Sequence, residues 1–167
     1  AASSDRHRGS SERRWSRRAQ AHLTVSQGLA DWLLNHYGVK ATVVYDRPLE
    51  VFTEPQPRVA EALWAKLAAE LSLANERIPL VVCPTSWTPD EDFDLLLEAL
   101  ERAERQLSPA TPSLVVILTG QGALRASFDA RAARRSFKAI AVRTHWLEPA
   151  DYPVLIGMAD LGLCLHQ

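Results

Sequence analysis

A strand, a sharp turn and a long amphipathic helix follow one another between Ile78 and Leu107, and this unit constrains the fold more than any other stretch. The segment from Leu80 to Cys83 is apolar on both faces and β-branched at its centre, which is typical of a buried strand in a parallel sheet. Pro84 cannot donate a hydrogen bond to a neighbouring strand, so we expect the strand to end there. The sequence thus predicts an α/β fold.

The helix that follows has a clearly marked start and one apolar face. Thr88 suits the N-cap, Pro89 the first helical position and Glu91 the acidic position of a capping box. The apolar side chains that recur at helical spacing should face the core: Phe93, Leu96, Leu97 and Leu100. Ser108-Pro109 is expected to end the helix.

The turn between this strand and helix is Thr85-Ser86-Trp87. Open α/β folds bind ligands at the carboxyl edge of their parallel strands. In one interpretation, hydroxyl and backbone N–H groups of the turn bind phosphate or sugar oxygens, and Trp87 stacks on a flat ring. In the other, Trp87 closes the end of the core and the hydroxyls cap the helix. The residues alone leave both interpretations open.

Strands and helices continue to alternate after this unit, which implies a parallel sheet with right-handed crossovers. Strands are expected at 114–118, 139–142 and 161–165, with helices between them. The turn after the first of these contains Gly120 and Gly122, whose backbone N–H groups can approach a phosphate at a helix N-terminus. The same glycines also suit a tight turn without a ligand, because the third glycine of a dinucleotide fingerprint is absent.

Two further loops are expected at the same edge of the sheet. One runs from Thr144 to Leu147 and contains His145 and Trp146, and the other begins at His166. The sequence shows no zinc-ligand spacing and no Ser-His-Asp set. The convergence of the turns on one edge therefore favours a nucleotide site more than any single turn does.

The chain is expected to divide into four stretches. Residues 1–20 read as a poorly ordered basic segment, for which contact with phosphate or anionic lipid and simple solvation both remain open. Residues 21–50 should form strands at 21–25 and 41–45 around a helix that Ser26 caps and Gly38 ends. Residues 51–77 should form a linker and an amphipathic helix, and 78–167 a nucleotide-binding α/β domain. The amphipathic helix within 51–77 is expected to direct four apolar side chains toward the core: Val59, Leu63, Leu67 and Leu71.

The composition sets broad limits on function. The formal net charge of -1 gives no overall attraction to nucleic acid or to a membrane. Cys83 and Cys164 both lie in apolar runs, which predicts buried, reduced thiols and suits a cytosolic setting. No apolar run is long enough to cross a bilayer.

Three segments resemble the chitobiosyldiphosphodolichol beta-mannosyltransferase family. They are TSWTPDEDFDLLLEAL at 85–100, ILTGQG at 117–122 and WLEPADYPVLIGMADLGLCLH at 146–166. HLTVSQGLADWL at 22–33 and ATVVYDRP at 41–48 extend the resemblance, which spans residues 21–167. The first and third segments are long and specific, whereas the glycine turn adds little.

The resemblance implies a two-domain glycosyltransferase of the GT-B type. The chain would supply an incomplete C-terminal half with a Rossmann-like parallel sheet, plus the tail of the N-terminal domain. The family transfers mannose from GDP-mannose to GlcNAc2-diphosphate-dolichol in a beta-1,4 link, on the cytosolic face of the endoplasmic reticulum membrane, during assembly of the N-glycosylation precursor. Inversion at the sugar implies one direct displacement with a general base. The implied partners are the nucleotide sugar, the dolichol-linked oligosaccharide and other glycosyltransferases, but no nucleic acid.

By the same resemblance, eight residues would contact the nucleotide-sugar donor: Ser86, Trp87, Thr88, Gly120, Gly122, Trp146, Leu147 and His166. The residues of the first two turns would approach the diphosphate. The two glycines would do so through their backbone N–H groups. Trp146 and Leu147 would form the guanine side, and His166 would approach the sugar-phosphate. The resemblance assigns no catalytic residue, metal or cofactor to this chain.

Two departures from the family pattern matter. Family members continue beyond His166 with a serine-rich loop and an acidic residue, and they begin with a membrane helix and most of an acceptor-binding domain. We therefore expect a fragment that folds partly, binds GDP weakly if at all and does not transfer mannose. Two alternatives stay open: a GT-B glycosyltransferase that uses another nucleotide sugar, and a non-catalytic α/β interaction module.

Overall fold

The computed structural model describes residues 15–16, 18–107 and 112–165. The chain divides into two compact units, residues 1–49 and 50–167. The predictions for residues 1–14, for Ser108-Pro109 and for His166 lie outside the described residues.

The first unit contains one well-capped helix, α2 (Gln27–Tyr37). The Ser26 hydroxyl accepts a hydrogen bond from the Leu29 N–H at 3.2 Å, which satisfies a donor at the helix start. Gly38 follows in the left-handed conformation, with φ 68°, and its N–H binds carbonyl groups of the last turn. The predicted helix and both of its caps are confirmed.

The strands of the first unit are short. β1 (Leu23–Thr24) and β2 (Thr42–Val43) pair in parallel. The strand expected at 41–45 covers only Thr42–Val43 and is not a buried strand, because Thr42 is exposed and the adjoining Val44 and Tyr45 are 54% and 65% exposed. Two short strands and one helix cannot cover both faces of a sheet.

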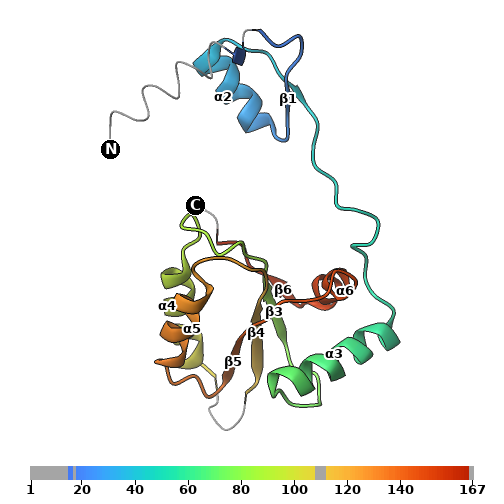
Figure 1. Ribbon diagram of the computed structural model, residues 1–167, viewed down its shortest axis with the longest axis vertical. Coiled ribbons are helices and arrows are strands. Elements are labelled where there is room, and N and C mark those ends of the chain that lie inside the picture. The colour runs from blue at the N-terminus through green and yellow to red at the C-terminus, as the bar shows by residue number, and fades with distance from the viewer. Residues whose placement is uncertain (1–14, 17, 108–111, 166–167) are drawn as a thin grey trace. The chain divides into compact units, whose positions relative to one another are not determined.

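The second unit is built on four parallel strands (Figure 1). They are β3 (Leu80–Cys83), β4 (Leu114–Leu118), β5 (Ile140–Thr144) and β6 (Leu161–Gly162). Their order in the sheet is β5-β4-β3-β6, so the chain changes direction across the sheet beside β3. Ligands of open α/β sheets bind outside the carboxyl ends of the strands at such a switch point.

Helices cover both faces of this sheet. Figure 1 shows α4 (Phe93–Glu104) and α5 (Arg125–Ala133) on one side, and α3 (Pro57–Leu71) and α6 (Asp151–Met158) on the other. The expected alternation of strands and helices and the Rossmann-like parallel sheet are confirmed. The helices α4 and α5 end earlier than expected, at Glu104 and Ala133.

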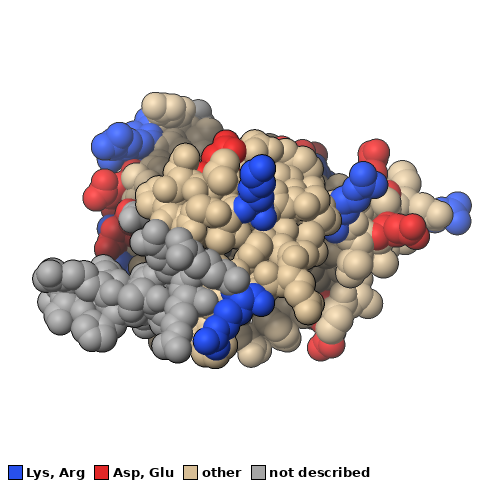
Figure 2. Space-filling model, turned by 90° about the horizontal axis from the view of Figure 1, so that it is seen from above, with Lys and Arg blue, Asp and Glu red and all other residues tan. Residues whose placement is uncertain are grey.

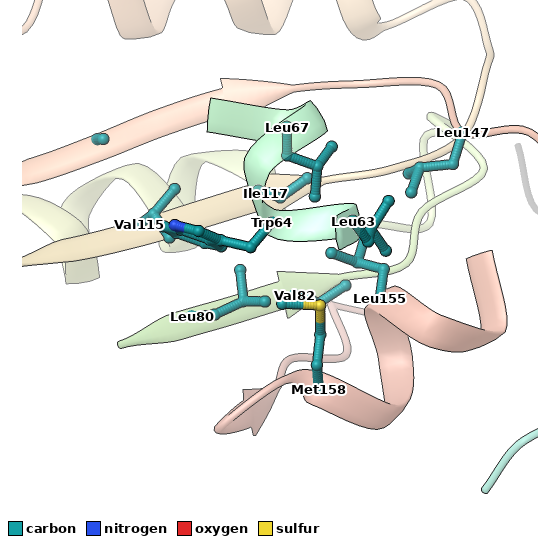
Figure 3. Packing of buried hydrophobic residues seen from close by; sticks show 11 residues of the cluster. Leu63, Trp64, Leu67, Leu80, Val82, Val115, Ile117, Leu147, Leu155 and Met158 are labelled. Carbon is teal, nitrogen blue, oxygen red and sulfur yellow. The ribbon is translucent and has the colours of Figure 1, made fainter. Parts of the chain in front are cut away.

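Helix α3 packs against the sheet through Leu63, Trp64 and Leu67, which Figure 3 shows pointing toward β3 and β4. The Trp64 indole N–H donates to the Asn75 carbonyl at 3.0 Å, so the buried ring has its polar group satisfied. The inward orientation expected for Val59 is wrong, since this side chain is 46% exposed. The buried face of α3 is turned toward Trp64, which leaves Val59 at its margin.

Helix α4 buries the side chains that its periodicity predicted. Phe93, Leu96, Leu97 and Leu100 are at most 6% exposed and pack with Phe128 of α5 on the other face of the sheet. This confirms the predicted apolar face.

Two carboxylates hold the amino edge of the sheet. Glu104 accepts hydrogen bonds from the N–H groups of residues 138, 139 and 140 at 2.6, 2.9 and 3.0 Å. Burial alone would raise the pKa of Glu104, but these three backbone donors outweigh it and hold the pKa below its ordinary value. Asp160 accepts from the Leu80 N–H at 2.7 Å and pairs with Arg77 at 3.0 Å, and the backbone bond lowers the pKa of Asp160. Both acids thus fix the starts of strands.

The two cysteines differ from each other. Cys83 is fully buried, as expected, and burial, with smaller effects of Glu91 and Cys164, raises the pKa of its thiol to about 12. The expectation that Cys164 is buried is wrong, because β6 ends at Gly162 and the cysteine lies exposed beyond it.

The surface shows no strong charge bias on the face seen in Figure 2, where acidic and basic side chains are interspersed. Among the helices that the structure describes, none has both the length and the apolar content needed to cross a lipid bilayer.

Candidate functional site

Three loops leave the carboxyl ends of β3, β4 and β5 at one edge of the sheet. The first loop comprises residues 84–92, the second loop 119–124 and the third loop 145–150. The first loop also meets the segment after β6, because the Asp92 N–H donates to the Leu165 carbonyl at 3.2 Å. The structure therefore brings Ser86, Trp87 and the two glycines together, while His166 lies outside the described residues.

The first loop is organised by Glu91, whose side chain is 5% exposed. Its carboxylate accepts a hydrogen bond from the Thr85 hydroxyl at 2.7 Å and from the Thr88 N–H at 3.0 Å. It also accepts from the Ser86 N–H at 3.3 Å and, more weakly, from the Ser86 hydroxyl at 3.4 Å. One buried anion thus binds residues on both sides of the turn.

The start of helix α4 differs from the prediction. Its N-cap is Asp92, whose carboxylate accepts from the Leu95 N–H at 2.8 Å, and not Thr88. The predicted contact between Glu91 and the Thr88 N–H is present, but it closes a turn that precedes the helix. The Glu91 carboxylate is directed to the first loop, so the helix begins only after it. The sequence correctly predicted that Glu91 accepts a hydrogen bond from the Thr88 N–H, but it did not predict that Glu91 organises the first loop.

Trp87 belongs to the core. Its side chain is 1% exposed and stacks on Phe93, with ring centroids 4.8 Å apart, while Phe128 lies 5.3 Å away. The interpretation in which Trp87 closes the end of the core is confirmed, and its ring is not free to stack on a ligand. The hydroxyls of the turn bind Glu91 and do not cap the helix.

The backbone of Trp87 is strained. Its φ of 58° lies in the left-handed region, which non-glycine residues seldom occupy. Its N–H donates to the Thr85 hydroxyl at 2.9 Å and its carbonyl accepts from the Leu124 N–H at 3.3 Å. The indole Nε1 is buried and has no partner among the described residues. Strain and an unsatisfied polar atom together are more common at functional sites than elsewhere.

Gly120 and Gly122 allow the second loop to pack directly on the backbone of the first. A Cβ atom on Gly120, which has φ 93°, would lie 1.8 Å from the Thr85 carbonyl oxygen. A Cβ atom on Gly122 would lie 2.2 Å from the Ser86 carbonyl oxygen. Both distances are far below van der Waals contact, so the two loops interlock only because these residues lack side chains.

The second loop also presents free backbone donors. Within the described residues, the N–H groups from Gly120 to Ala123 donate to no other backbone group. The loop leads into α5, whose first turn has no side-chain cap. Uncapped N–H groups at a helix start attract anions. Arg125 is close by, but its guanidinium donates to the Thr144 carbonyl at 3.2 Å and lies 3.8 Å from Asp129.

The third loop presents one aromatic side chain to solvent. Trp146 is 51% exposed, whereas Leu147 is buried in the core. His145 is held between β4 and α3, because its N–H donates to the Leu118 carbonyl at 2.9 Å and its Nε2 lies 3.2 Å from a Glu70 oxygen. A pocket of about 110 Å³ adjoins this loop between α3 and the start of α6.

Metal ligands do not gather at this edge. In the part of the chain that the structure describes, no three or more His, Cys, Asp or Glu side chains are placed to hold a metal ion. The described residues at this edge include hydroxyls, backbone N–H groups, the Glu91 carboxylate, the Arg125 guanidinium and an exposed indole.

Comparison with known proteins gives this edge a family context. The chain is 35% identical to the chitobiosyldiphosphodolichol beta-mannosyltransferase of Pongo abelii and 33% identical to that of Homo sapiens, in each case over 93% of this chain and 40% of the relative. It is 30% identical to "UDP-glycosyltransferase TURAN" of Arabidopsis thaliana over 93% of this chain and 44% of that protein. No protein-family model matches the chain.

A solved structure shows the same fold. The catalytic domain of starch synthase IV from Arabidopsis thaliana, bound to ADP and acarbose, superposes with a TM-score of 0.53 over 86% of this chain and 34% of that chain, at 16% sequence identity. At this identity the likeness establishes the GT-B type of fold alone. The chain spans 40% of the length of the mannosyltransferases named above, and by sequence it is related to the chitobiosyldiphosphodolichol beta-mannosyltransferase family.

Proposed function

We propose that this chain supplies the donor-binding part of a mannosyltransferase that uses GDP-mannose. The acceptor would be GlcNAc2-diphosphate-dolichol, joined through a beta-1,4 link, and the enzyme would act at the cytosolic face of the endoplasmic reticulum membrane beside other glycosyltransferases. The observation that carries the proposal is the similarity, over 93% of the chain, to several proteins named chitobiosyldiphosphodolichol beta-mannosyltransferase. The donor, the linkage and the membrane face are part of the proposal.

The carboxyl edge of the sheet gives the proposal a physical basis. A nucleoside diphosphate sugar needs donors for its phosphates and a surface for its base. The free N–H groups of the second loop, at the start of α5, suit the phosphates. The exposed indole of Trp146 suits one side of the base. The hydroxyls of Ser86 and Thr88, 3.0 Å apart, complete the diphosphate side from the first loop.

Nucleotide selectivity tests the proposal on the 167-residue chain itself. Calorimetric titration with GDP, UDP and ADP should show the tightest binding for GDP. UDP is the critical competitor, because one relative carries that nucleotide in its name. NMR amide shifts in the labelled chain should change at Gly120 and Gly122 on addition of GDP.

The amino edge of the same sheet provides an internal control. The Ala139 N–H is bonded to Glu104 there and should not respond to GDP. Tighter binding of UDP or ADP would point to another nucleotide sugar. No binding at millimolar GDP, or shifts confined to the amino edge, would contradict the proposal.

A further inference from the structure

Three successive N–H groups of the first loop, at its turn, are already used within the protein. Those of Ser86 and Thr88 donate to the Glu91 carboxylate, and that of Trp87 donates to the Thr85 hydroxyl. A phosphate cannot take these donors without breaking existing hydrogen bonds. The second loop is the opposite case, since its N–H groups from Gly120 to Ala123 have no backbone acceptor among the described residues.

Glu91 is also unsuited to touch a diphosphate. It is a buried carboxylate that accepts bonds from both sides of the turn, and its negative charge repels phosphate oxygens. Its influence on a bound donor must therefore pass through the groups that it holds. The hydroxyls of Ser86 and Thr88 lie 3.0 Å apart, and each donates to the same Glu91 oxygen only at long range, at 3.4 and 3.5 Å. Because a hydroxyl rotates about its C–O bond, either proton can leave this weak contact for a phosphate oxygen.

The conformation that Glu91 holds is costly. A non-glycine residue with positive φ and a buried polar atom without a partner are each unfavourable. Trp87 combines both features. Such a conformation persists only where its surroundings fix it, and here the Thr85–Glu91 hydrogen bond and the packing of Trp87 on Phe93 do so.

We infer that Glu91 is a positioning residue for the donor: it holds the first loop so that the Ser86 and Thr88 hydroxyls, and not their backbone N–H groups, face the diphosphate of a nucleotide sugar. The backbone contacts to phosphate then come from the second loop. This inference rests on the proposed function, because it assigns a role within the same donor site.

Glu91→Gln tests the inference, because glutamine keeps the shape of the side chain but loses the charge and one acceptor oxygen. In the 167-residue chain, calorimetry should show GDP affinity reduced about tenfold, the scale of one charge-assisted hydrogen bond. Amide hydrogen exchange at Ser86 and Thr88 should quicken without ligand. Glu91→Asp, which restores the charge on a shorter side chain, should recover part of the affinity.

Glu104→Gln is the matched control. Glu104 also accepts several backbone N–H groups, but at the amino edge of the sheet. This variant should lose stability while binding GDP as tightly as the unaltered chain. If Glu91→Gln behaves in the same way, Glu91 is only structural and the inference is overturned. If the unaltered chain does not bind GDP, the proposed function fails and the inference fails with it.

A milder variant covers the case in which Glu91→Gln does not fold. Thr85→Val removes the shortest bond to Glu91 and the acceptor of the Trp87 N–H. Its folded form should bind GDP more weakly than the unaltered chain. Unchanged affinity in folded Thr85→Val would overturn the inference.

Discussion

The two edges of the central sheet use carboxylates in different ways. At the amino edge, Glu104 and Asp160 are partly exposed and accept N–H groups that begin β5 and β3. At the carboxyl edge, Glu91 is buried and accepts groups of a strained turn. The amino edge thus fixes strand starts through partly exposed acids, whereas the carboxyl edge holds the left-handed backbone of Trp87 by buried packing. The proposed donor site therefore lies at the edge where close packing, and not partly exposed acids, fixes the loops.

Glu104 illustrates how the amino edge is stabilised. It is the last residue of α4, where the helix dipole disfavours a negative charge. Three N–H groups at the start of β5 offset this cost, and they tie the end of the helix to the first residue of the strand. At the carboxyl edge, α5 is tied to the end of β5 in a different way: Arg125 donates to the Thr144 carbonyl, and the Thr144 hydroxyl donates to Asp129.

The largest effect should follow from Gly120→Ala, which breaks the packing of the carboxyl edge. The added Cβ would overlap the Thr85 carbonyl oxygen at 1.8 Å, and alanine is strained at φ 93°. We expect a loss of roughly 3 kcal/mol or more in the free energy of unfolding, from strain and overpacking together. Urea unfolding followed by circular dichroism measures this loss.

Gly162→Ala is the matched control within the same sheet. Nothing lies within 4 Å of the Cβ position of Gly162, and its φ is not in the left-handed region. Its effect should stay within about 0.5 kcal/mol. Equal losses in the two variants would show that the interlocked loops do not account for the sensitivity of Gly120.

Local patterns sufficed to predict the strands and the buried face of α4. Leu80–Cys83 and Leu114–Leu118 are apolar runs whose burial needs no long-range information, and the α4 periodicity gave Phe93 and Leu97 their places. The site was harder to predict. The role of Gly120 depends on a carbonyl group 35 positions earlier, at Thr85, and no local pattern contains that contact.

The burial of individual side chains was also decided by tertiary contacts. Cys164 lies in an apolar run, but β6 ends before it and leaves it exposed. Trp87 offered two interpretations, and only the positions of Phe93 and Phe128 decide between them. The donor contacts of the eight residues proposed from the resemblance remain a prediction.

A smaller effect on the free energy of unfolding is expected at the amino edge, and it should depend on pH. The folded pKa values of Glu104 and Asp160 lie below their ordinary values of 4.5 and 3.8. Their contribution to stability is therefore fully present above those values and is lost as the pH falls through the folded pKa values. Glu104→Gln and Asp160→Asn should each cost about 1 kcal/mol at neutral pH, since the acids are partly exposed, and little in strong acid.

Urea unfolding at about pH 7 and about pH 3 measures this difference. Glu98→Gln, which removes an exposed acid from the same helix as Glu104, is the control and should change stability little at either pH. A cost of Glu104→Gln that is the same at both pH values would show that its charge does not hold the strand start.

The smallest expected effect is on the reactivity of the two thiols. Their modification reports whether the loops at the carboxyl edge shield Cys83 from solvent. Cys83 ends β3 beneath the first loop, is fully buried and has a pKa raised to about 12, whereas Cys164 is exposed. Because the thiolate is the reactive form, iodoacetamide should modify Cys164 alone in the folded chain, and mass spectrometry should find both adducts after unfolding.

In Gly120→Ala, the displaced loops should make Cys83 reactive without denaturant. Rapid modification of Cys83 in the unaltered chain would mean that the first and second loops separate readily in solution, and the contrast between a partly exposed amino edge and a tightly packed carboxyl edge would then be lost.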